Sequence, residues 1–515
     1  MPHISHTLIR ADAGPRIGTG HVMRCIALGQ AVKRIGGQVD FVCGQLPGKL
    51  QQRILNEGFG LATIESAAGS VGDVRELNKL VAEAEPNWVL LDGYGFSDEY
   101  QAELALERSQ LACIDDFGHA KHDRASLVLN QNIYSSSSDY SNTASKTETL
   151  TGSRFTMLRD EFASKTNNNR QQNIPSRAKR ILVTFGGADP NNMTAQILET
   201  VDAAAIEGAS IDVILGPCYE HAESLRELVK TSRSTIRLHR NVDNMYALMN
   251  RIHLAITGGG TTSYELARCG IPSIVIPIAD NQIPIAEKLN ELGIAALGNM
   301  TDLQSGGLKK LISRLIRDVD RRREMSDISQ KIIDGQGANR VARHMVSKVF
   351  HFRDAELADA QLLLNWRNEP EVRAVSFQNK TIPFETHRDW LANKLGSRES
   401  RLKIIEDAQG TPVAQIRLDF EPQNDAAVIS INVIPSCRGR GLGTALIERA
   451  TREITNEFGN FRLIARIKAS NTASQNAFSK AGFTPTTSKT INDHVALEYV
   501  FETQSPPAVP LRIAS

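Results

Sequence analysis

The feature that most constrains the fold is an alternation of short apolar runs with helical segments through the larger part of the 515-residue chain. Helical spacing with a period near four runs from His21 to Ile35 and stops at Gly36-Gly37. Four apolar runs in this part have the length of buried strands: Thr7–Arg10, Gln38–Cys43, Trp88–Leu91 and Leu111–Ile114. Such an alternation is typical of a doubly wound α/β sheet with helices on both faces.

The alternation restarts after a polar segment, Thr166–Ser176, which reads TNNNRQQNIPS and is predicted to be a linker. Further elements are predicted as strands at Arg180–Phe185, Ile211–Leu215, Leu254–Thr257 and Ser273–Ile278, and as a helix at Thr262–Cys269. Two consecutive halves of similar size predict two Rossmann-like lobes, residues 1–165 and 177–345, facing a cleft. A Ser/Thr-rich stretch, Ser135–Thr149, is predicted to be a surface loop.

A change of texture follows a turn-rich break at Asp334–Ala338. Polar helices come first, and strands are then predicted at Lys403–Ile405, Pro412–Phe420, Ala427–Val433 and Leu463–Ile467. This order of elements predicts a third domain of α+β type over residues 351–505. Three globular units also agree with a usual domain size of ~100–200 residues.

The composition is that of a globular protein, with 41% hydrophobic and 23% charged residues. A net charge of +1 gives no electrostatic reason to expect nucleic acid or an anionic membrane as a partner. The six cysteines form no C-x-x-C pair, so neither a disulfide framework nor a structural zinc site is expected. Because Met1–Ala11 lacks the apolar segment of a secretory signal, we expect a cytoplasmic protein.

The C-terminal domain contains a strand, a glycine-rich loop at Arg438–Gly443 and a helix at Thr444–Arg452. Backbone amides in such a loop can bind a pyrophosphate, helped by the helix dipole, although glycines alone also occur in ordinary turns. Asn471–Ser474, Phe478 and Lys480–Phe483 follow. Together these motifs, over about 150 residues, resemble the GCN5-related N-acetyltransferase (GNAT) family.

The resemblance implies acetyl-CoA as co-substrate, with the pyrophosphate on the amides of residues 438–444 and the pantetheine arm beside a splayed strand. The implied cofactor-binding residues are Val433, Arg438, Gly439, Arg440, Gly441, Gly443, Thr444 and Asn471. Many members have a Tyr that protonates the leaving thiolate, whereas this chain has Phe478, so the general acid is unassigned. Candidates for the general base are strand residues that are equally explained as solvated positions: Asp419, Glu421 and Ser430.

A second constellation lies near the N-terminus, where residues 10–24 read RADAGPRIGTGHVMR. His21 follows a glycine-rich loop and starts a helix, where the dipole favours neutral imidazole over imidazolium. A neutral imidazole that a substrate can approach suits a general base, although a structural histidine at a helix cap is the alternative.

The second lobe carries two glycine-rich loops, Gly186-Gly187 and Gly258–Gly260, each directly after a predicted strand. Their amides can bind a diphosphate without a metal. Glu265, one turn into the following helix, can accept two ribose hydroxyls or can serve only as a partner of the helix dipole.

These motifs, together with Ala279–Gln282, resemble the UDP-sugar hydrolases of pseudaminic acid biosynthesis over residues 5–345. The resemblance implies a glycosyltransferase-B-like fold with His21 as catalytic base. It implies a metal-free inverting hydrolysis that cleaves the sugar C–O bond of a UDP-2,4-diacetamido-2,4,6-trideoxy-β-L-altropyranose. The predicted substrate-binding residues are Asp12, Gly20, Arg24, Gly187, Gly259, Glu265, Asn281 and Gln282. Asp92 and Asp115 either shape the pocket or cap strand ends.

Both resemblances together predict two adjacent steps on one chain: acetylation of a UDP-4-amino sugar and hydrolysis of the product. Three alternatives stay open at this point. The first lobes can belong to a glycosyltransferase, since one fold serves both chemistries. The sugar can belong to a related nonulosonic or spore-coat pathway. The chain can also be a non-catalytic regulator that binds sugar nucleotides. The sequence leaves the sugar stereochemistry and the oligomeric state open.

Overall fold

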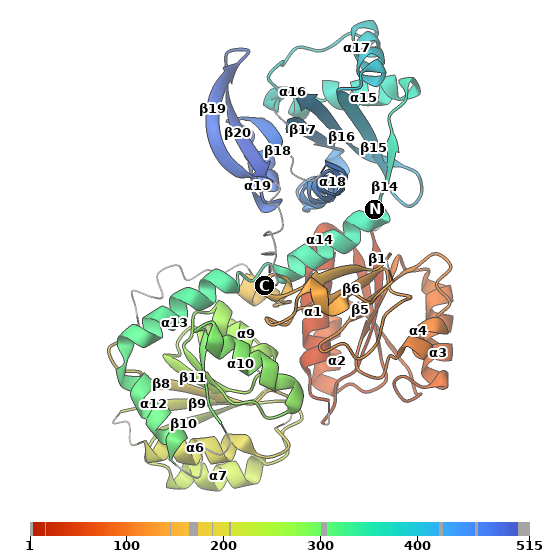
Figure 1. Cartoon of the computed structure of the whole chain (residues 1–515). Helices are drawn as coiled ribbons and strands as arrows, with labels where there is room; N and C mark the ends of the chain where they lie inside the picture. Colours follow the sequence, from red (N-terminus) through yellow and green to blue (C-terminus); the bar gives the residue numbers. More distant parts are fainter. Residues whose placement is uncertain are drawn as a thin grey trace, which may run out of the picture. The chain divides into compact units, whose positions relative to one another are not determined.

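The computed structural model of the chain describes residues 4–502, apart from residues 16, 145, 164–173, 188, 205–207, 241, 300–305, 422–425 and 459–461. Most of the predicted linker, and Arg16 and Ala188 of the two N-terminal motifs, therefore lie outside the described residues. The chain divides into two compact units (Figure 1). The first unit extends to Ala342, apart from a few residues near the N-terminus, and the second starts at Arg343.

The first lobe of the first unit contains a seven-stranded sheet whose order is β3-β2-β1-β4-β5-β6-β7. All its strand pairs are parallel. Its elements are β1 (His6–Ala11), α1 (Gly20–Ile35), β2 (Gln38–Cys43), α2 (Gly48–Asn56), β3 (Gly60–Thr63), α3 (Val71–Ala84), β4 (Trp88–Asp92), α4 (Asp98–Ala102), β5 (Gln110–Ile114), β6 (Leu127–Asn130), η1 (Ser137–Tyr140), β7 (Glu148–Thr151), η2 (Ser153–Phe155) and α5 (Asp160–Ala163).

The strand order of this lobe reverses direction between β1 and β4, which are paired in register with Ala11 opposite Asp92. Helices α1 and α2 lie on one face of the sheet and α3 and α4 on the other (Figure 1). Parallel strands covered on both faces must be apolar throughout, and every residue of β4 is buried. Ligands of such sheets bind at the carboxyl ends of the strands beside the reversal.

The second lobe contains a six-stranded parallel sheet in the order β10-β9-β8-β11-β12-β13. Its elements, with the helices that follow them, are β8 (Arg180–Thr184), α6 (Met193–Ala203), β9 (Ser210–Leu215), α7 (Ala222–Thr231), β10 (Thr235–Arg240), α8 (Met245–Met249), β11 (Leu254–Thr257), α9 (Thr261–Arg268), β12 (Ser273–Val275), η4 (Asp280–Gln282), α10 (Ile283–Glu291), β13 (Ala295–Leu297), α12 (Gly307–Arg317), α13 (Val319–Ile332) and α14 (Gly337–Val349).

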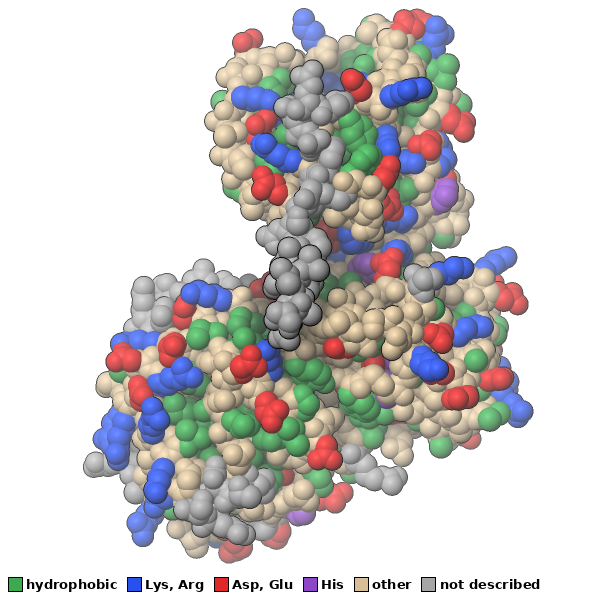
Figure 2. Space-filling model, viewed as in Figure 1, with side chains coloured by type: hydrophobic (Ala, Val, Ile, Leu, Met, Phe, Trp, Pro, Cys, Tyr) green, Lys and Arg blue, Asp and Glu red, His purple; other side chains and the backbone are tan. Residues whose placement is uncertain are grey.

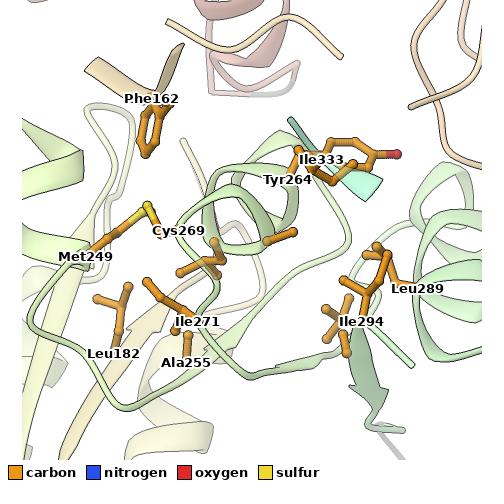
Figure 3. Packing of buried hydrophobic residues seen from close by; sticks show 14 of the residues in the cluster. Phe162, Leu182, Met249, Ala255, Tyr264, Cys269, Ile271, Leu289, Ile294 and Ile333 are labelled. Atoms are coloured by element: carbon orange, nitrogen blue, oxygen red, sulfur yellow. The ribbon is translucent and has the colours of Figure 1, made fainter. Parts of the chain in front are cut away.

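Successive residues of β8 pack into two different cores of this lobe. Ile181 and Val183 belong to the cluster with α6 and α12, whereas Leu182 belongs to the cluster with α9 and α10. Phe162 lies just before the predicted linker. It also packs in the second of these clusters, beside Met249 and Cys269 (Figure 3). The chain segment before the predicted linker thus contributes to the core of the second lobe.

The second unit contains one mixed sheet in the order β14-β15-β16-β17-β18-β20-β19. Its elements are β14 (His351–Asp354), η5 (Leu357–Asp359), α15 (Ala360–Asn368), α16 (Pro370–Val375), α17 (Phe384–Gly396), β15 (Ser400–Glu406), β16 (Pro412–Glu421), β17 (Ala426–Val433), η7 (Pro435–Cys437), α18 (Leu442–Phe458), β18 (Arg462–Lys468), α19 (Thr472–Lys480), β19 (Thr484–Ile491) and β20 (His494–Glu502). All its described strand pairs are antiparallel except β17 with β18.

The predicted fold class, a pair of Rossmann-like α/β lobes followed by an α+β domain, is confirmed. Two local predictions need correction. The stretch Ser135–Thr149 is not all loop, because η1 buries Tyr140 and β7 adds a strand to the sheet. The predicted strand at Ser273–Ile278 ends at Val275.

Charges on the visible face of the molecule are mixed in sign over both units (Figure 2), in keeping with the net charge of +1. Among the described residues, every helix is too short or too polar to cross a membrane.

We predict that Phe162→Ala destabilises the first unit by about 3–5 kcal/mol, the usual cost of truncating a buried aromatic side chain. Phe162 is fully buried and its ring lies edge-on to Tyr246, with centroids 6.1 Å apart. Urea unfolding followed by circular dichroism measures the change. Phe117→Ala is the control, because Phe117 is 53% exposed and should shift the transition little. Equal stabilities of the two variants would contradict the packing described.

Candidate functional site

The loop between β1 and α1 places His21 at the start of a helix beside the sheet reversal. Gly14 and Gly18 pair through two backbone hydrogen bonds of 3.0 and 2.8 Å, and Gly18 has a φ of +73°. A positive φ of this size suits glycine, so the tight loop depends on it. His21 itself is 8% exposed, in the first turn of α1.

Asp12 anchors the β1–α1 loop through the hydrogen bonds of its carboxylate. Its Oδ1 accepts hydrogen bonds from the amides of Gly44 and Gln45, at 2.6 and 3.0 Å, and from Arg10 Nη1 at 2.7 Å. Asp12 does not line the cleft described below, and its contact with substrate stays a prediction. With its oxygen occupied by three donors, the carboxylate fixes the β1–α1 loop against the loop after β2.

His21 belongs to a buried network of charged side chains. Its Nδ1 lies 2.6 Å from Oδ1 of Asp92, the last residue of β4. Arg24 donates to both oxygens of Asp92, at 2.8 and 2.7 Å, and to both oxygens of Asp116, at 2.7 and 3.1 Å. One guanidinium therefore joins two carboxylates, and one of these carboxylates holds the histidine.

The charges of this network set its protonation. Burial by itself would raise the pKa of Asp92, but the charge of Arg24 and the hydrogen bonds from Arg24 and His21 lower it well below its usual range. The pKa of Asp116 is also lowered, because Arg24 outweighs its burial. An ionised Asp92 can only accept, so Nδ1 of His21 carries the hydrogen and Nε2 is left to accept a proton.

Tyr94, two residues beyond β4, is a site residue that the sequence analysis missed. Its ring is edge-on to His21 with centroids 5.0 Å apart, and its hydroxyl donates to Asp116 at 2.9 Å. Burial and the charge of Asp116 raise the pKa of this hydroxyl. The hydroxyl also accepts from Asn281 of the second lobe at 3.2 Å. Its place just after a buried strand that ends in Asp92 was the available signal.

A cleft of about 1150 Å³ lies between the two lobes of the first unit. Its lining includes His21, Arg24, Tyr94 and Asp116 from the first lobe. The other predicted substrate-binding residues that line it are Gly20, Gly187, Gly259, Glu265, Asn281 and Gln282. The structure thus brings together all the predicted first-unit site residues except Asp12.

The glycine-rich loops of the second lobe form one wall of this cleft. A Cβ on Gly187 would lie 2.7 Å from Thr19 Oγ1, so the close approach of the two lobes at this point requires a residue without a side chain. Gln282 Oε1 accepts from the amides of Gly259 and Ile278, at 2.9 and 3.1 Å. Gln282 therefore holds the loop after β11 rather than only facing a ligand.

Glu265 is held by an arginine that the sequence analysis also missed. Arg159 Nη2 lies 2.8 Å from Glu265 Oε1 and 3.1 Å from Glu161 Oε1. Arg159 is 4% exposed and precedes α5, so it reaches the second lobe from the segment before the linker. The ion pair orients the carboxylate that was predicted to bind ribose.

Asp115, His119 and His122 are the one group of potential metal ligands found among the described residues. Gln101 Nε2 lies 3.1 Å from His122 Nδ1 and can only donate, so the hydrogen of this ring sits on Nε2. That Nε2 lies 3.5 Å from Asp115. Asp115 accepts from His119 and from the amide of Gly118, so it caps its own loop, whereas Nε2 of His122 has no hydrogen-bond partner among the described residues.

In the second unit, β17 and β18 pair only from Ala426–Val428 with Arg462–Ile464 and then separate. The end of β17 at Val433 is therefore free on the side of β18. Gly439 and Gly441 follow with φ values of +75° and +94°, and α18 begins at Leu442. This combination leaves a gap between strands beside a glycine loop and a helix N-terminus, an arrangement suited to an extended anionic cofactor.

The side chain of Arg438 points to the protein rather than to a free anion site. It pairs with Glu369 and Glu371, at 2.7 and 2.8 Å, and donates to the carbonyl of Val433 at 2.7 Å. These contacts tie the loop to the end of β17. A Cβ on Gly443 would lie 3.7 Å from Val433, so the predicted pantetheine and pyrophosphate residues are neighbours.

Several other predicted residues of this unit have contacts within the protein or are buried. Asn471 caps α19 by accepting from the amide of Ser474, and Thr444 is buried. Phe478 is buried against Phe483 and carries no proton for a leaving group. Asp419 is paired with Lys394 and Arg417, and these charges lower its pKa despite its burial. Glu421 pairs with Arg466, while Ser430 is half-buried on β17.

Comparison with known proteins assigns the two units separately. The family model of the acetyltransferase (GNAT) domain matches residues 350–484. YwnH of Bacillus subtilis, which is named for acetyl transfer to phosphinothricin, is 32% identical over 116 residues, covering 22% of this chain and 69% of YwnH. The C-terminal domain belongs to the GNAT acetyltransferase family. The co-substrate of this GNAT domain is acetyl-CoA, as predicted.

The second lobe matches the family model of the glycosyltransferase family 28 C-terminal domain over residues 180–341. The spore coat polysaccharide biosynthesis protein SpsG of Bacillus subtilis is 21% identical over 340 residues, covering 65% of this chain and 96% of SpsG. MJ1062 of Methanocaldococcus jannaschii is 24% identical over 413 residues, covering 77% of this chain and 79% of MJ1062. The chain thus joins a sugar-nucleotide enzyme to a GNAT acetyltransferase.

We predict that Asp92→Asn lowers the free energy of unfolding by about 3 kcal/mol at pH 7, because it leaves Arg24 buried with one partner fewer. The folded pKa of Asp92 is lowered, so its stabilisation is complete above the unfolded pKa of about 3.9 and is lost as the pH falls below it. Denaturant unfolding across the pH range should therefore show that the difference in free energy of unfolding between the wild-type protein and the variant becomes smaller below about pH 4. Asp123→Asn, at an exposed position, is the control. Equal losses of stability in the two variants would contradict the role of Asp92 in the buried network.

We predict that Gly441→Ala weakens CoA binding by about tenfold, because an L-residue at a φ of +94° strains the loop by about 1–2 kcal/mol. Isothermal titration calorimetry with CoA measures the change without a known acceptor. Gly396→Ala is the matched control, since Gly396 has no positive φ and an added Cβ meets nothing within 4 Å. Unchanged affinity of the Gly441 variant would contradict the assignment of the loop.

Proposed function

We propose that the chain acetylates the 4-amino group of a UDP-sugar and then hydrolyses the product to UDP and a free diacetamido sugar. The proposed hydrolysis substrate is UDP-2,4-diacetamido-2,4,6-trideoxy-β-L-altropyranose, in pseudaminic acid biosynthesis. The observation that carries the proposal is the His21–Asp92 pair on the wall of a cleft whose opposite wall holds two glycine-rich loops.

Hydrolysis requires a base, a bound diphosphate and water. With Nδ1 hydrogen-bonded to Asp92, the Nε2 atom of His21 accepts a proton from water as the water oxygen attacks the anomeric carbon. The bond between that carbon and the diphosphate oxygen breaks, and UDP leaves with the bonding electron pair. Attack opposite the leaving group inverts the anomeric carbon. Asp92 stabilises the imidazolium that forms.

The second lobe is suited to bind the UDP group. The amides of the loops at Gly187 and Gly258–Gly260 line the cleft together with the N-terminus of α9, which attracts phosphate oxygens. Glu265, held by Arg159, is placed one turn further along α9 to accept ribose hydroxyls. No resident metal is needed in this scheme, since the protein itself supplies the donors for the diphosphate.

Acetyl transfer is proposed in the GNAT domain. The lone pair of the sugar amine attacks the thioester carbon, a C–N bond forms, and the C–S bond breaks to release CoA as the thiolate. The amine gives up a proton and the thiolate takes one up. Because Phe478 cannot supply that proton, we expect water or another group to do so.

A second candidate is a glycosyltransferase that passes the sugar to an acceptor alcohol. The match of the second lobe to a glycosyltransferase family favours it. Incubating the protein with the UDP-amino sugar and acetyl-CoA separates the two by mass spectrometry. A hydrolase releases CoA, UDP and free sugar without any acceptor. An acetylated UDP-sugar without UDP release would remove the hydrolase proposal.

We predict that His21→Ala reduces UDP release by about 10²–10⁴-fold, the usual contribution of a general base, while N-acetylation continues. Acetylation should continue because the GNAT domain belongs to the other unit. Quantifying UDP and acetylated UDP-sugar in the same reaction measures both steps. His351→Ala, an exposed histidine of the second unit, is the control. Unchanged UDP release in the His21 variant would contradict its role as the base.

A further inference from the structure

Helix α2 of the first lobe presents one polar face to the cleft, and neither the base nor the glycine loops account for it. Lys49, Gln52, Arg53 and Asn56 line the cleft from this helix. Their spacing of three or four residues places them on one side of an α-helix. Ile54, which does not line the cleft, is buried in the lobe, and Leu50 is buried at the edge of the cleft lining. The polar face therefore has a fixed orientation toward whatever the cleft binds.

Arg53 is the residue of this polar face whose side chain has a hydrogen-bond donor without a partner among the described residues. It is half-buried, and its Nε is buried without a hydrogen-bond partner among the described residues. A buried hydrogen-bond donor without a partner lowers the stability of the fold, and the loss of stability is larger when the donor belongs to a charged group than when it is neutral. In a side chain on a cleft wall, such a donor can be satisfied by a ligand of the cleft.

The charged groups around Arg53 are already engaged with others. Arg159 repels it, and the carboxylates near it are Glu57, Glu161 and Glu265. Glu161 and Glu265 both pair with Arg159, and Glu57 accepts from Gln30 at 2.8 Å. Burial and the charge of Arg159 lower the pKa of Arg53. None of these contacts among the described residues satisfies Nε of Arg53.

We infer that Arg53 binds the phosphates of the nucleotide, reaching from the first lobe to a UDP group held by the second. The inference rests on the proposed function. Arg53 lies close enough to Glu265 of α9 to feel its charge, and the N-terminus of α9 lines the same cleft. A guanidinium can donate to two phosphate oxygens at once, and Nε of Arg53 is a donor without a partner among the described residues.

This placement gives the nucleotide contacts on both sides of the cleft. The glycine loops contact it from the second lobe, and Arg53 contacts it from the lobe that also carries His21. Binding of the diphosphate then favours a closed cleft around the base. When the C–O bond breaks, negative charge grows on the departing diphosphate, and a guanidinium on its oxygens stabilises that charge.

The test compares UDP with uridine by isothermal titration calorimetry on the full-length protein. We expect Arg53→Gln to weaken UDP binding by about 10- to 100-fold, the effect of losing a charge-assisted contact. Uridine binding should change little, because uridine has no phosphate. Arg53→Lys keeps the positive charge but loses the two-pronged geometry of the guanidinium, so its UDP affinity should lie between those of the wild-type protein and Arg53→Gln. Gln51→Ala, exposed on the same helix but outside the cleft lining, is the matched control.

Each outcome decides between the two proposals. If the wild-type protein binds UDP and Arg53→Gln binds it equally well, the inference on Arg53 is overturned and the proposed function stands. Equal losses for UDP and uridine also overturn it, since Arg53 would then act through the nucleoside or the packing of the lobes. If the wild-type protein binds neither ligand, both proposals fall. CoA affinity and the melting temperature of each variant verify that it is folded.

Discussion

The geometry of the first unit depends on a single guanidinium buried between two carboxylates. Arg24, Asp92 and Asp116 have each lost nearly all contact with water, which is tolerable only if almost every donor and acceptor is satisfied. The network therefore has essentially one arrangement. Because His21 is hydrogen-bonded to the same Asp92, that arrangement also fixes which ring nitrogen is available for chemistry. Tyr94 donates to Asp116 and accepts from Asn281, so the hydrogen-bond network continues into the second lobe.

The second unit depends on a different constraint, the early end of pairing between two parallel strands. After Val428 and Ile464 the strands β17 and β18 no longer share hydrogen bonds, so backbone groups of β17 are left for another partner. The loop that follows is tied to the end of β17 by Arg438, whose side chain pairs with two glutamates and donates to the carbonyl of Val433. The two units thus have different candidate sites for anions: a cleft lined by glycine loops in one, and a separated strand pair beside a glycine loop in the other.

Much of the fold could be predicted because its signals are local. Buried parallel strands are continuous apolar runs, so Trp88–Leu91 and Leu254–Thr257 were found with nearly the observed bounds. The glycine loops could be located because each follows such a strand. The hydrogen-bond partners of Asp12 could not be predicted, because its neighbours along the chain resemble a binding loop, while Gly44 and Gln45 are more than thirty residues away. Tyr94 and Arg159 were missed since their partners belong to other strands and the other lobe.

The sequence by itself determined the elements, the glycine positions and the identity of the histidine at the start of α1. These follow from the local preferences of the backbone and from the burial of apolar runs. Only the tertiary structure decided the partners: Asp92 for His21, Arg159 for Glu265, and no hydrogen-bond partner among the described residues for Nε of Arg53. The reason is that hydrogen bonds and charges act over a few ångströms between residues 70 to 110 positions apart. Such neighbours exist only after the strands have taken their order in the sheet.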